Sequence, residues 1–380
     1  MPPVRLAGIP LVVAVFFAAG DARAYPEFQF TKTADRCSNC HFSPSGGGLI
    51  NSYGRLQAEE EISMFGGNPD FLYGIWEQPD WIKLGVDLRV AGVTRENGSD
   101  MDTAVFPMQG DTYANFFFGD FTIATILGPR ASARTPRQSF AERMHSREHY
   151  IMWRKKNRGP YVRLGRFYAP FGLRQQDHTA FNRRYTGFHS FEETYNLSGG
   201  VVENDWEAHL TAFVPPPGPL YKIFSGGPRQ TGAAALYERR ILKRSGAIAG
   251  QAKVAFSDLD ARYIAGGYAK YFLESADVLF MSELDLTLQT FDVSGSDSRA
   301  QLTGYASATY FPTQGLMFGG AIMRHDTDLA VADTGFDALQ ASIQFFPRSH
   351  LELHTFARVE FSGDYRKGRG LLFLMLHYWL

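Results

Sequence analysis

The feature that most limits the fold is a polarity pattern with a period of two, which runs from Trp81 to the C-terminus. Short segments alternate apolar and polar residues, so each would place an apolar face and a charged face on opposite sides of a sheet. The segments at residues 206–214, 283–289 and 351–361 show this most clearly. Two environments suit such strands: a soluble sandwich, or a barrel that is apolar toward lipid and polar toward its lumen.

Loop lengths favour the barrel. Tight connections such as "KNRG", "KRSG" and "TQG" alternate with longer ones such as "PPPGPLYKIFSGGPRQ" and "HDTDLAVADTG". Short turns at one end and long loops at the other are typical of outer-membrane barrels, whose short turns face the periplasm. The alternate positions from Leu372 to Leu380 form one apolar face, similar to the terminal strand that the outer-membrane insertion machinery recognises. The sequence therefore predicts an all-β fold, a transmembrane antiparallel β-barrel over residues 81–380.

The number of strands follows from parity, because a barrel with both termini in the periplasm needs an even number. Fifteen segments can be read directly from the alternation. The segment at residues 161–168 must run outward, which requires one more strand before Met152. Residues 138–144 are the best candidate, so we expect sixteen strands, or fourteen if two weak segments are loops.

The first 24 residues predict export. Arg5 supplies a positive start, residues 6–20 are apolar, and the "ARA" string at residues 22–24 places signal-peptide cleavage before Tyr25. A membrane anchor is the alternative, but the apolar run is too short for a spanning helix. We therefore expect the outer membrane of a Gram-negative cell, with its lipid as a partner. The balance of 38 basic and 39 acidic residues indicates no nucleic-acid partner.

Residues 25–80 contain both cysteines of the chain, in the string Cys37-Ser38-Asn39-Cys40-His41. This C-x-x-C-H pattern is the attachment site of c-type haem, where two thiols reach one porphyrin and the imidazole reaches its iron. The pattern predicts one covalent haem c, held by Cys37, Cys40 and His41. A redox-active pair lacks a thioredoxin-like context, a zinc site lacks a fourth ligand nearby, and a disulfide would close almost no loop.

The same segment predicts a small α-helical monohaem cytochrome domain, with one helix over residues 49–65 that ends at Gly66 and Gly67. About 50 residues are too few to hold an apolar core alone, so we expect the porphyrin and the barrel lumen to supply it. Met64, at the end of this helix, is the candidate second iron ligand. The alternatives are a lumen-facing His178, His209 or His354, and an open site with water.

A strongly basic stretch includes "YVRLGRFYAPFGLRQQDHTAFNRR" at residues 161–184, which resembles the strand and constriction loop of phosphate-selective porins. Two interpretations stay open. The charges are solvated at turns and loops, or they line a lumen that favours anions or haem propionates. The arginines in question are Arg163, Arg166, Arg174, Arg183 and Arg184.

The order of signal peptide, C-x-x-C-H, "GGGLINSYGRL" and porin-like strands resembles the fused monohaem cytochrome–porins, best known as outer-membrane iron oxidases. Residues 50–55 correspond to an L-N-x-F-G-R element of that family. The resemblance implies electron transfer between an extracellular donor or acceptor, with Fe(II) among the candidates, and a periplasmic c-type cytochrome. The alternative is a passive anion-preferring porin in which the haem-bearing segment is a plug or redox gate.

Overall fold

The computed structural model describes residues 25–31, 34–97, 100–129, 144–190, 192–217, 229–291, 298–362 and 368–380. The predicted signal peptide at residues 1–24 lies outside the described residues. So does the strand predicted at residues 138–144, apart from Met144. The described chain is mostly β-sheet, and its α-helices are short elements that precede Trp81 or lie in one loop.

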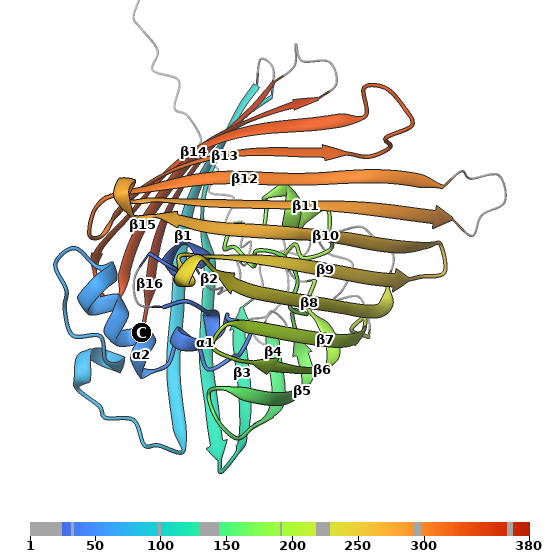
Figure 1. The fold of residues 1–380 in the computed structure, drawn as a ribbon. Helices are drawn as coiled ribbons and strands as arrows, with labels where there is room; N and C mark the ends of the chain where they lie inside the picture. The colour runs from blue at the N-terminus through green and yellow to red at the C-terminus, as the bar shows by residue number, and fades with distance from the viewer. Residues whose placement is uncertain are drawn as a thin grey trace, which may run out of the picture.

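Sixteen strands form one closed sheet, in which neighbours in sequence pair antiparallel and the first strand pairs with the last (Figure 1). The prediction of sixteen strands is confirmed, and the alternative of fourteen is wrong. The described strand next to the predicted position begins at Met144. The strands are β1 (Ile82–Asn97), β2 (Asp100–Phe118), β3 (Phe121–Pro129), β4 (Met144–Arg154), β5 (Gly159–Phe167), β6 (Thr194–Val202), β7 (Trp206–Val214), β8 (Thr231–Ile241), β9 (Gly246–Phe256), β10 (Asp260–Leu273), β11 (Val278–Phe291), β12 (Arg299–Thr313), β13 (Leu316–Asp326), β14 (Gly335–Arg348), β15 (Leu351–Ser362) and β16 (Arg369–Trp379).

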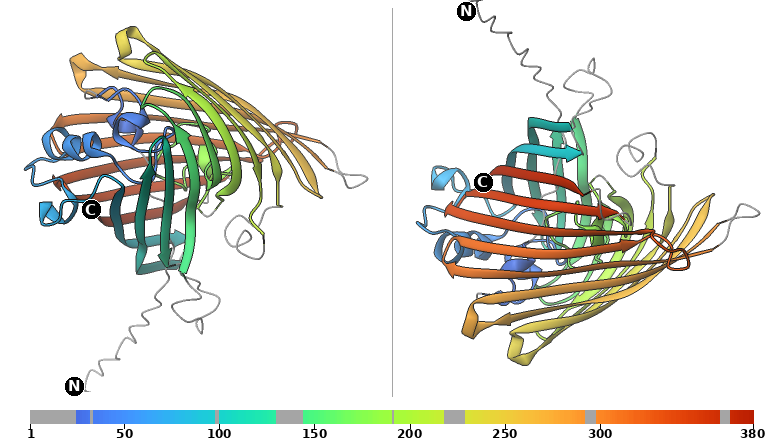
Figure 2. Two further views of the ribbon diagram at one scale, coloured as in Figure 1. Left: turned by 90° about the horizontal axis from the view of Figure 1, so that it is seen from below. Right: turned by 90° about the horizontal axis from the view of Figure 1, so that it is seen from above.

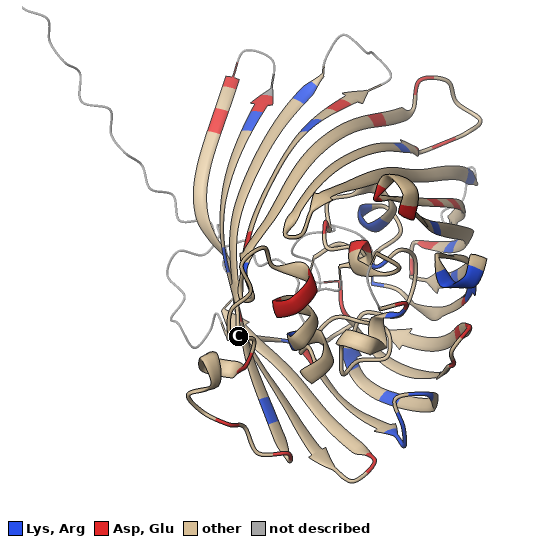
Figure 3. Ribbon diagram, turned by 60° about the vertical axis from the view of Figure 1, so that its left-hand side comes forward, with Lys and Arg blue, Asp and Glu red and all other residues tan. Residues whose placement is uncertain are grey.

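The alternating pattern has its apolar face outward. On β11, Leu284 and Leu286 are 57% and 50% exposed, whereas Glu283 and Asp285 between them are buried inside the barrel. A soluble protein would bury the leucines and expose the carboxylates, so this arrangement is that of a membrane barrel. Figure 3 shows long uncharged stretches along the strands, with many charged residues at strand ends and on segments within the barrel. The chain is therefore an outer-membrane barrel of the Gram-negative type.

The two ends of the barrel differ in their connections. At the end where β16 finishes, consecutive strands are joined by short turns, including residues 155–158, 203–205 and 314–315. The other end has longer connections, such as residues 168–193 and 327–334. Both groups agree with the predicted loop lengths. Figure 1 shows the C-terminus and the N-terminal helices together at the short-turn end.

The connection between β5 and β6, residues 168–193, folds back into the lumen. It carries the short helix α4 (Phe181–Arg184), whose Phe181 packs with Ala321 and Met323 of β13. Asn182 of α4 donates a hydrogen bond to the inward-facing Glu283, at 2.5 Å. The resemblance to a constriction loop therefore extends to its placement inside the barrel.

Residues 25–80, which we call the plug, form irregular chain with short helices at the short-turn mouth (Figure 2). These are the 3₁₀-helix η1 (Pro26–Phe28), the α-helices α1 (Cys37–Cys40) and α2 (Ser52–Gln57), the π-helix η2 (Ala58–Ile62) and the 3₁₀-helix η3 (Phe71–Gly74). No helix in the described part of the chain has both the length and the apolar character needed to cross a membrane.

The single helix predicted over residues 49–65 is wrong in its bounds. Leu49 lies in a bend, and Ile50 pairs with His41 in an isolated bridge. The helix begins only after Asn51, whose side chain accepts a hydrogen bond from the Gly54 amide at 2.9 Å and so caps it. It changes to π-helical geometry after Gln57 and ends at Ile62, before the predicted glycines.

The barrel wall supplies the core that the plug lacks. Phe30 is buried in a cluster with Leu236 of β8 and Leu279 of β11. Arg163 of β5 donates hydrogen bonds to the hydroxyl groups of Ser43 and Ser45, at 3.0 and 3.1 Å. Packing and hydrogen bonds thus tie the plug to strands on several sides of the barrel.

Candidate cofactor site

The C-x-x-C-H string forms one helical turn and then reverses. The amide of His41 donates to the Cys37 carbonyl at 3.0 Å, which closes the turn of α1. Three glycines at residues 46–48, all with positive φ, then turn the chain back. The amide of Asn51 donates to the Cys40 carbonyl at 2.8 Å, so the returning chain fixes the second cysteine.

Helix α2 supports this turn from behind. The Asn51 side chain donates to the Asn39 carbonyl at 2.8 Å while it caps α2, which joins the two helices. Gly54 lies against Cys40, where a Cβ atom would come within 2.5 Å of the Cys40 carbonyl oxygen. Arg55 donates to the Pro69 carbonyl at 3.2 Å. Asn51 and Gly54 therefore hold the cysteine-bearing turn in place, whereas Arg55 joins α2 to the later part of the plug.

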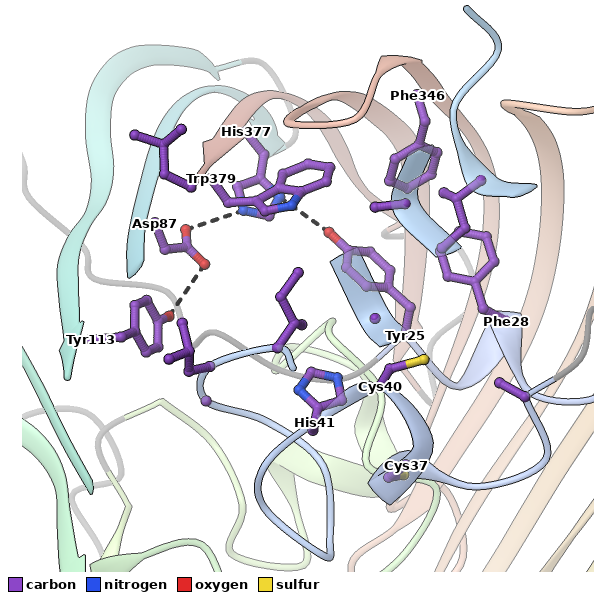
Figure 4. Close-up of a pocket in the computed structure, with 18 of the residues that line it drawn as sticks. Tyr25, Phe28, Cys37, Cys40, His41, Asp87, Tyr113, Phe346, His377 and Trp379 are labelled. Carbon is purple, nitrogen blue, oxygen red and sulfur yellow. Dashed lines mark hydrogen bonds and ion pairs between the residues drawn. The ribbon is translucent and has the colours of Figure 1, made fainter. Parts of the chain in front are cut away.

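Cys37, Cys40 and His41 line one cavity between the plug and the barrel wall (Figure 4). The volume of the cavity is about 140 Å³. This is below the roughly 300–1,000 Å³ of small-molecule and cofactor sites, so a porphyrin would also extend into the open space beside the cavity. Opposite the plug, the wall contributes residues of both strands that close the barrel. They are Val86, Asp87 and Arg89 of β1, and His377 and Trp379 of β16.

The imidazole of His41 is buried and has the protonation state that binds a metal. Burial lowers the pKa of its imidazole to about 4, although hydrogen bonds with the backbone of Gly48 and Gly47 act in the opposite direction. Its Nδ1 atom is buried and has no hydrogen-bond partner among the described residues. The ring is therefore neutral at physiological pH, and the neutral imidazole is the form that binds metals.

The two cysteines are free thiols rather than thiolates. Burial raises the pKa of Cys37 and raises that of Cys40 to about 12. Gln29 donates a hydrogen bond to the Cys37 sulfur at 3.2 Å. A redox-active cysteine needs a lowered pKa. Moreover, the described residues contain no group of three or more His, Cys, Asp or Glu side chains that could hold a metal ion.

These features supply the side-chain chemistry that covalent haem attachment would use. Two thiols and a neutral imidazole open on the same space, and the surrounding side chains include Phe28, Leu49 and Phe346, which offer apolar surface. Covalent haem c would be held there by Cys37 and Cys40, with His41 as the iron ligand.

The structure separates Met64 from this site. Met64 does not line the cavity; its amide donates to the Phe346 carbonyl at 2.8 Å, and its side chain packs on Gly315 in the turn after β12. The three histidines named as alternatives do not line it either. His178 contacts His189, His209 lies 2.7 Å from the Tyr161 hydroxyl, and His354 packs with Phe356.

Besides His41, the histidine that lines the cavity among the described residues is His377, which the sequence analysis did not identify. It faces inward between the outward-facing Leu376 and Tyr378 of the last strand. The alternation could have revealed this inward position. Only closure of the barrel, however, places β16 beside β1 and the plug.

The arginines of the basic stretch do not line the cavity, and most are already paired. Arg166 forms an ion pair with Glu193 at 3.3 Å, and Arg174 one with Glu207 at 2.9 Å. Arg183 donates to backbone carbonyls, whereas Arg184 is exposed. These contacts reduce the excess positive charge that the sequence suggests.

No family model and no curated protein matches the chain. Solved structures do match. OmpT of Vibrio cholerae has a TM-score of 0.58 and 8% identity, covering 80% of this chain and 99% of its own. The outer-membrane channel DcaP of Acinetobacter baumannii has 0.57 and 9%, covering 79% and 97%. An anion-selective porin from Comamonas acidovorans has 0.56 and 10%, covering 79% and 99%. At these identities the likeness shows the fold alone, which is that of outer-membrane porins.

Proposed function

We propose that this protein is an outer-membrane electron-transfer protein that carries one covalent haem c between its plug and the barrel wall. The observation that supports it is the shared cavity of Cys37, Cys40 and His41. A haem attached there supplies an iron centre that gains and loses single electrons. The proposal includes an extracellular donor or acceptor, with Fe(II) among the candidates, and a periplasmic c-type cytochrome as partner.

Each residue of the site would have a separate role in holding the haem. Cys37 and Cys40 provide the thiols for attachment, and the neutral ring of His41 provides a nitrogen for the iron. Apolar side chains from plug and wall supply much of the lining of the cavity. Exclusion of water and the polarity of the surroundings both tune the potential of a haem.

A series of aromatic contacts leads from the cavity to the surface and supports electron exchange at the short-turn end. Trp379 lines the cavity, and its ring centroid lies 6.5 Å from that of His350. The His350 ring is 4.9 Å from that of Tyr73, which is 50% exposed. Because this end is the one that short turns assign to the periplasm, a soluble periplasmic cytochrome would meet Tyr73 there.

One haem cannot bridge the membrane alone, because the hydrocarbon layer is about 30 Å thick. The site lies close to the short-turn mouth, so the longer part of the path runs toward the extracellular loops. We infer that the donor or acceptor enters the barrel from that side.

The second candidate function is a passive anion-preferring porin with the plug as a gate. The fold likeness favours it, since the matching structures are outer-membrane channels and porins, one of them described as anion-selective. The plug and the inward loop at residues 168–193 both occupy the lumen of this barrel, which reduces the room for free diffusion.

One experiment separates the two functions. The full-length protein is expressed with a working c-type cytochrome maturation system, purified from outer membranes and reconstituted in liposomes that enclose a redox dye. Electron transfer predicts a haem-stained band and dye reduction by an external donor, both lost in Cys37→Ala/Cys40→Ala. Ion conductance without haem staining or dye reduction would reject electron transfer and support the porin.

A further inference from the structure

We propose that His377 of β16 is the second axial ligand of the haem iron, so that the plug provides one imidazole and the barrel wall the other. This inference deepens the proposed function and rests on it. It starts from the placement of His41 and His377, which line the same cavity from opposite sides (Figure 4).

Few other side chains of the cavity can bind iron. Neither a methionine nor a lysine lines it among the described residues. The two tyrosines that line it are committed elsewhere: Tyr25 donates to Glu352, and Tyr113 donates to Asp87 at 3.3 Å. His377 is therefore the remaining side chain with a suitable nitrogen.

The ring of His377 is oriented as in many metal-bound histidines. Its Nδ1 lies 2.8 Å from a carboxylate oxygen of Glu352, which accepts the hydrogen bond. The Tyr25 hydroxyl lies 3.1 Å from the same nitrogen, and the Trp379 ring packs beside the imidazole with 4.8 Å between centroids. Metal-bound histidines commonly donate their second ring nitrogen to a carboxylate in this way, which fixes the orientation of the ring.

The other nitrogen, Nε2, is the one available to iron. It is buried and forms an ion-pair contact with Asp87 Oδ1 at 3.2 Å, which iron would replace. Asp87 does not depend on this contact. Arg89 donates two hydrogen bonds to its carboxylate, at 3.0 and 3.1 Å, and Tyr113 adds the third. Movement of Nε2 from Asp87 to a metal would leave no unpaired charge.

Ligation by His377 would have two consequences. It would join the plug to the barrel through the cofactor, because His41 and His377 belong to separate parts of the chain. It would also give the iron two imidazoles, and His/His ligation lacks the increase in potential that a methionine ligand brings. The haem would be low-spin and closed to small ligands.

The test compares spin states in purified, haem-loaded full-length protein. We expect wild type to be low-spin by electron paramagnetic resonance and unreactive with carbon monoxide when reduced. His377→Ala should retain covalent haem, become high-spin and bind carbon monoxide, and added imidazole should restore the low-spin spectrum. The matched control is His354→Ala, an inward-facing histidine of the neighbouring strand that does not line the cavity. It should behave as wild type.

Several outcomes would overturn the inference. These are a high-spin wild type, a low-spin His377→Ala, or a change of spin state in Met64→Ala instead. If His377→Ala does not assemble, His377→Gln keeps a polar side chain of similar size and must show the same high-spin spectrum and imidazole rescue. Failure of the proposed function would give a different result from failure of this inference, because wild type would then carry no covalent haem at all.

Discussion

Gly54 lies so close to Cys40 that a Cβ atom on the glycine would approach the Cys40 carbonyl oxygen to 2.5 Å and Cys40 Cα to 3.0 Å. This contact lets α2 pack on the turn that bears the cysteines. Gly54→Ala should displace that turn and lower the yield of covalent haem several-fold, while the barrel still assembles. Haem staining normalised to protein measures the effect. Gly250→Ala is the control, since a Cβ there meets nothing within 4 Å. Equal haem content in the two variants would contradict the role of this contact.

Removal of the attachment residues should abolish or reduce haem attachment without preventing assembly of the barrel. Cys37→Ala/Cys40→Ala should abolish covalent haem, and His41→Ala should reduce attachment and change the spectrum of any haem that remains. The barrel should still insert in both variants, because its backbone hydrogen bonds close within the sheet. Haem staining and the liposome assay on the same preparations test this. A cysteine double variant that still reduces the enclosed dye would contradict it.

Arg163 should control how firmly the plug is held. Its guanidinium is buried, donates to Ser43 and Ser45, and lies 3.6 Å from the Phe167 ring centroid. Arg163→Met removes both hydrogen bonds and leaves the two hydroxyls only their contact with each other at 3.3 Å, a loss of about 1–3 kcal/mol in docking. We expect faster proteolysis of the plug and higher ion conductance in planar bilayers. Arg184→Met, on the exposed arginine of α4, should change neither.

Plug docking should depend on pH through Glu27. Burial raises the pKa of this carboxyl from 4.5 to about 7, and the nearby Glu352 adds to the increase. The docked state thus keeps a proton that a released plug loses above about pH 4.5, so docking weakens as pH rises through 7. Protease digestion should remove the plug faster at pH 8 than at pH 5.5. In Glu27→Gln, which cannot ionise, this difference should shrink; an unchanged difference would assign the pH dependence to other groups.

The strands could be predicted from sequence because each of them must place apolar side chains toward lipid and polar side chains toward the lumen. The polarity of Leu284 and Glu283 is enough to predict which side of the sheet each side chain faces, without knowledge of the neighbouring strands. The cysteine turn could be predicted for a similar reason, since Cys37, Cys40 and His41 are adjacent in the chain. Each of these features depends only on local sequence.

The rest of the site depends on barrel closure. Trp379 pairs with Asp87, which brings together the last strand and the first, and no local pattern encodes that pairing. His377 was missed for this reason. The ion pairs could not be predicted for the same reason, because the partner of Arg174 is Glu207, which lies on a strand far along the chain. Met64 was expected at the end of the predicted helix, but the helix ends at Ile62 and Met64 packs on the barrel turn instead.

Tyr73 should carry electrons between the site and a soluble partner. Its ring is the exposed end of the contacts that start at Trp379, and its hydroxyl accepts a hydrogen bond from Tyr378 at 3.1 Å. Tyr73→Leu keeps an apolar side chain but removes the aromatic ring, so haem content and spectrum should stay at wild-type values. Stopped-flow oxidation of the reduced protein by a small soluble c-type cytochrome should slow several-fold. The control is Phe65→Leu, which alters an exposed aromatic of the same plug, 61% accessible, outside this series of rings. If both variants transfer electrons at the wild-type rate, the partner receives them elsewhere on the short-turn end. If both slow equally, the substitutions weaken docking of the cytochrome partner, and the rings that connect Tyr73 to the cavity are not responsible.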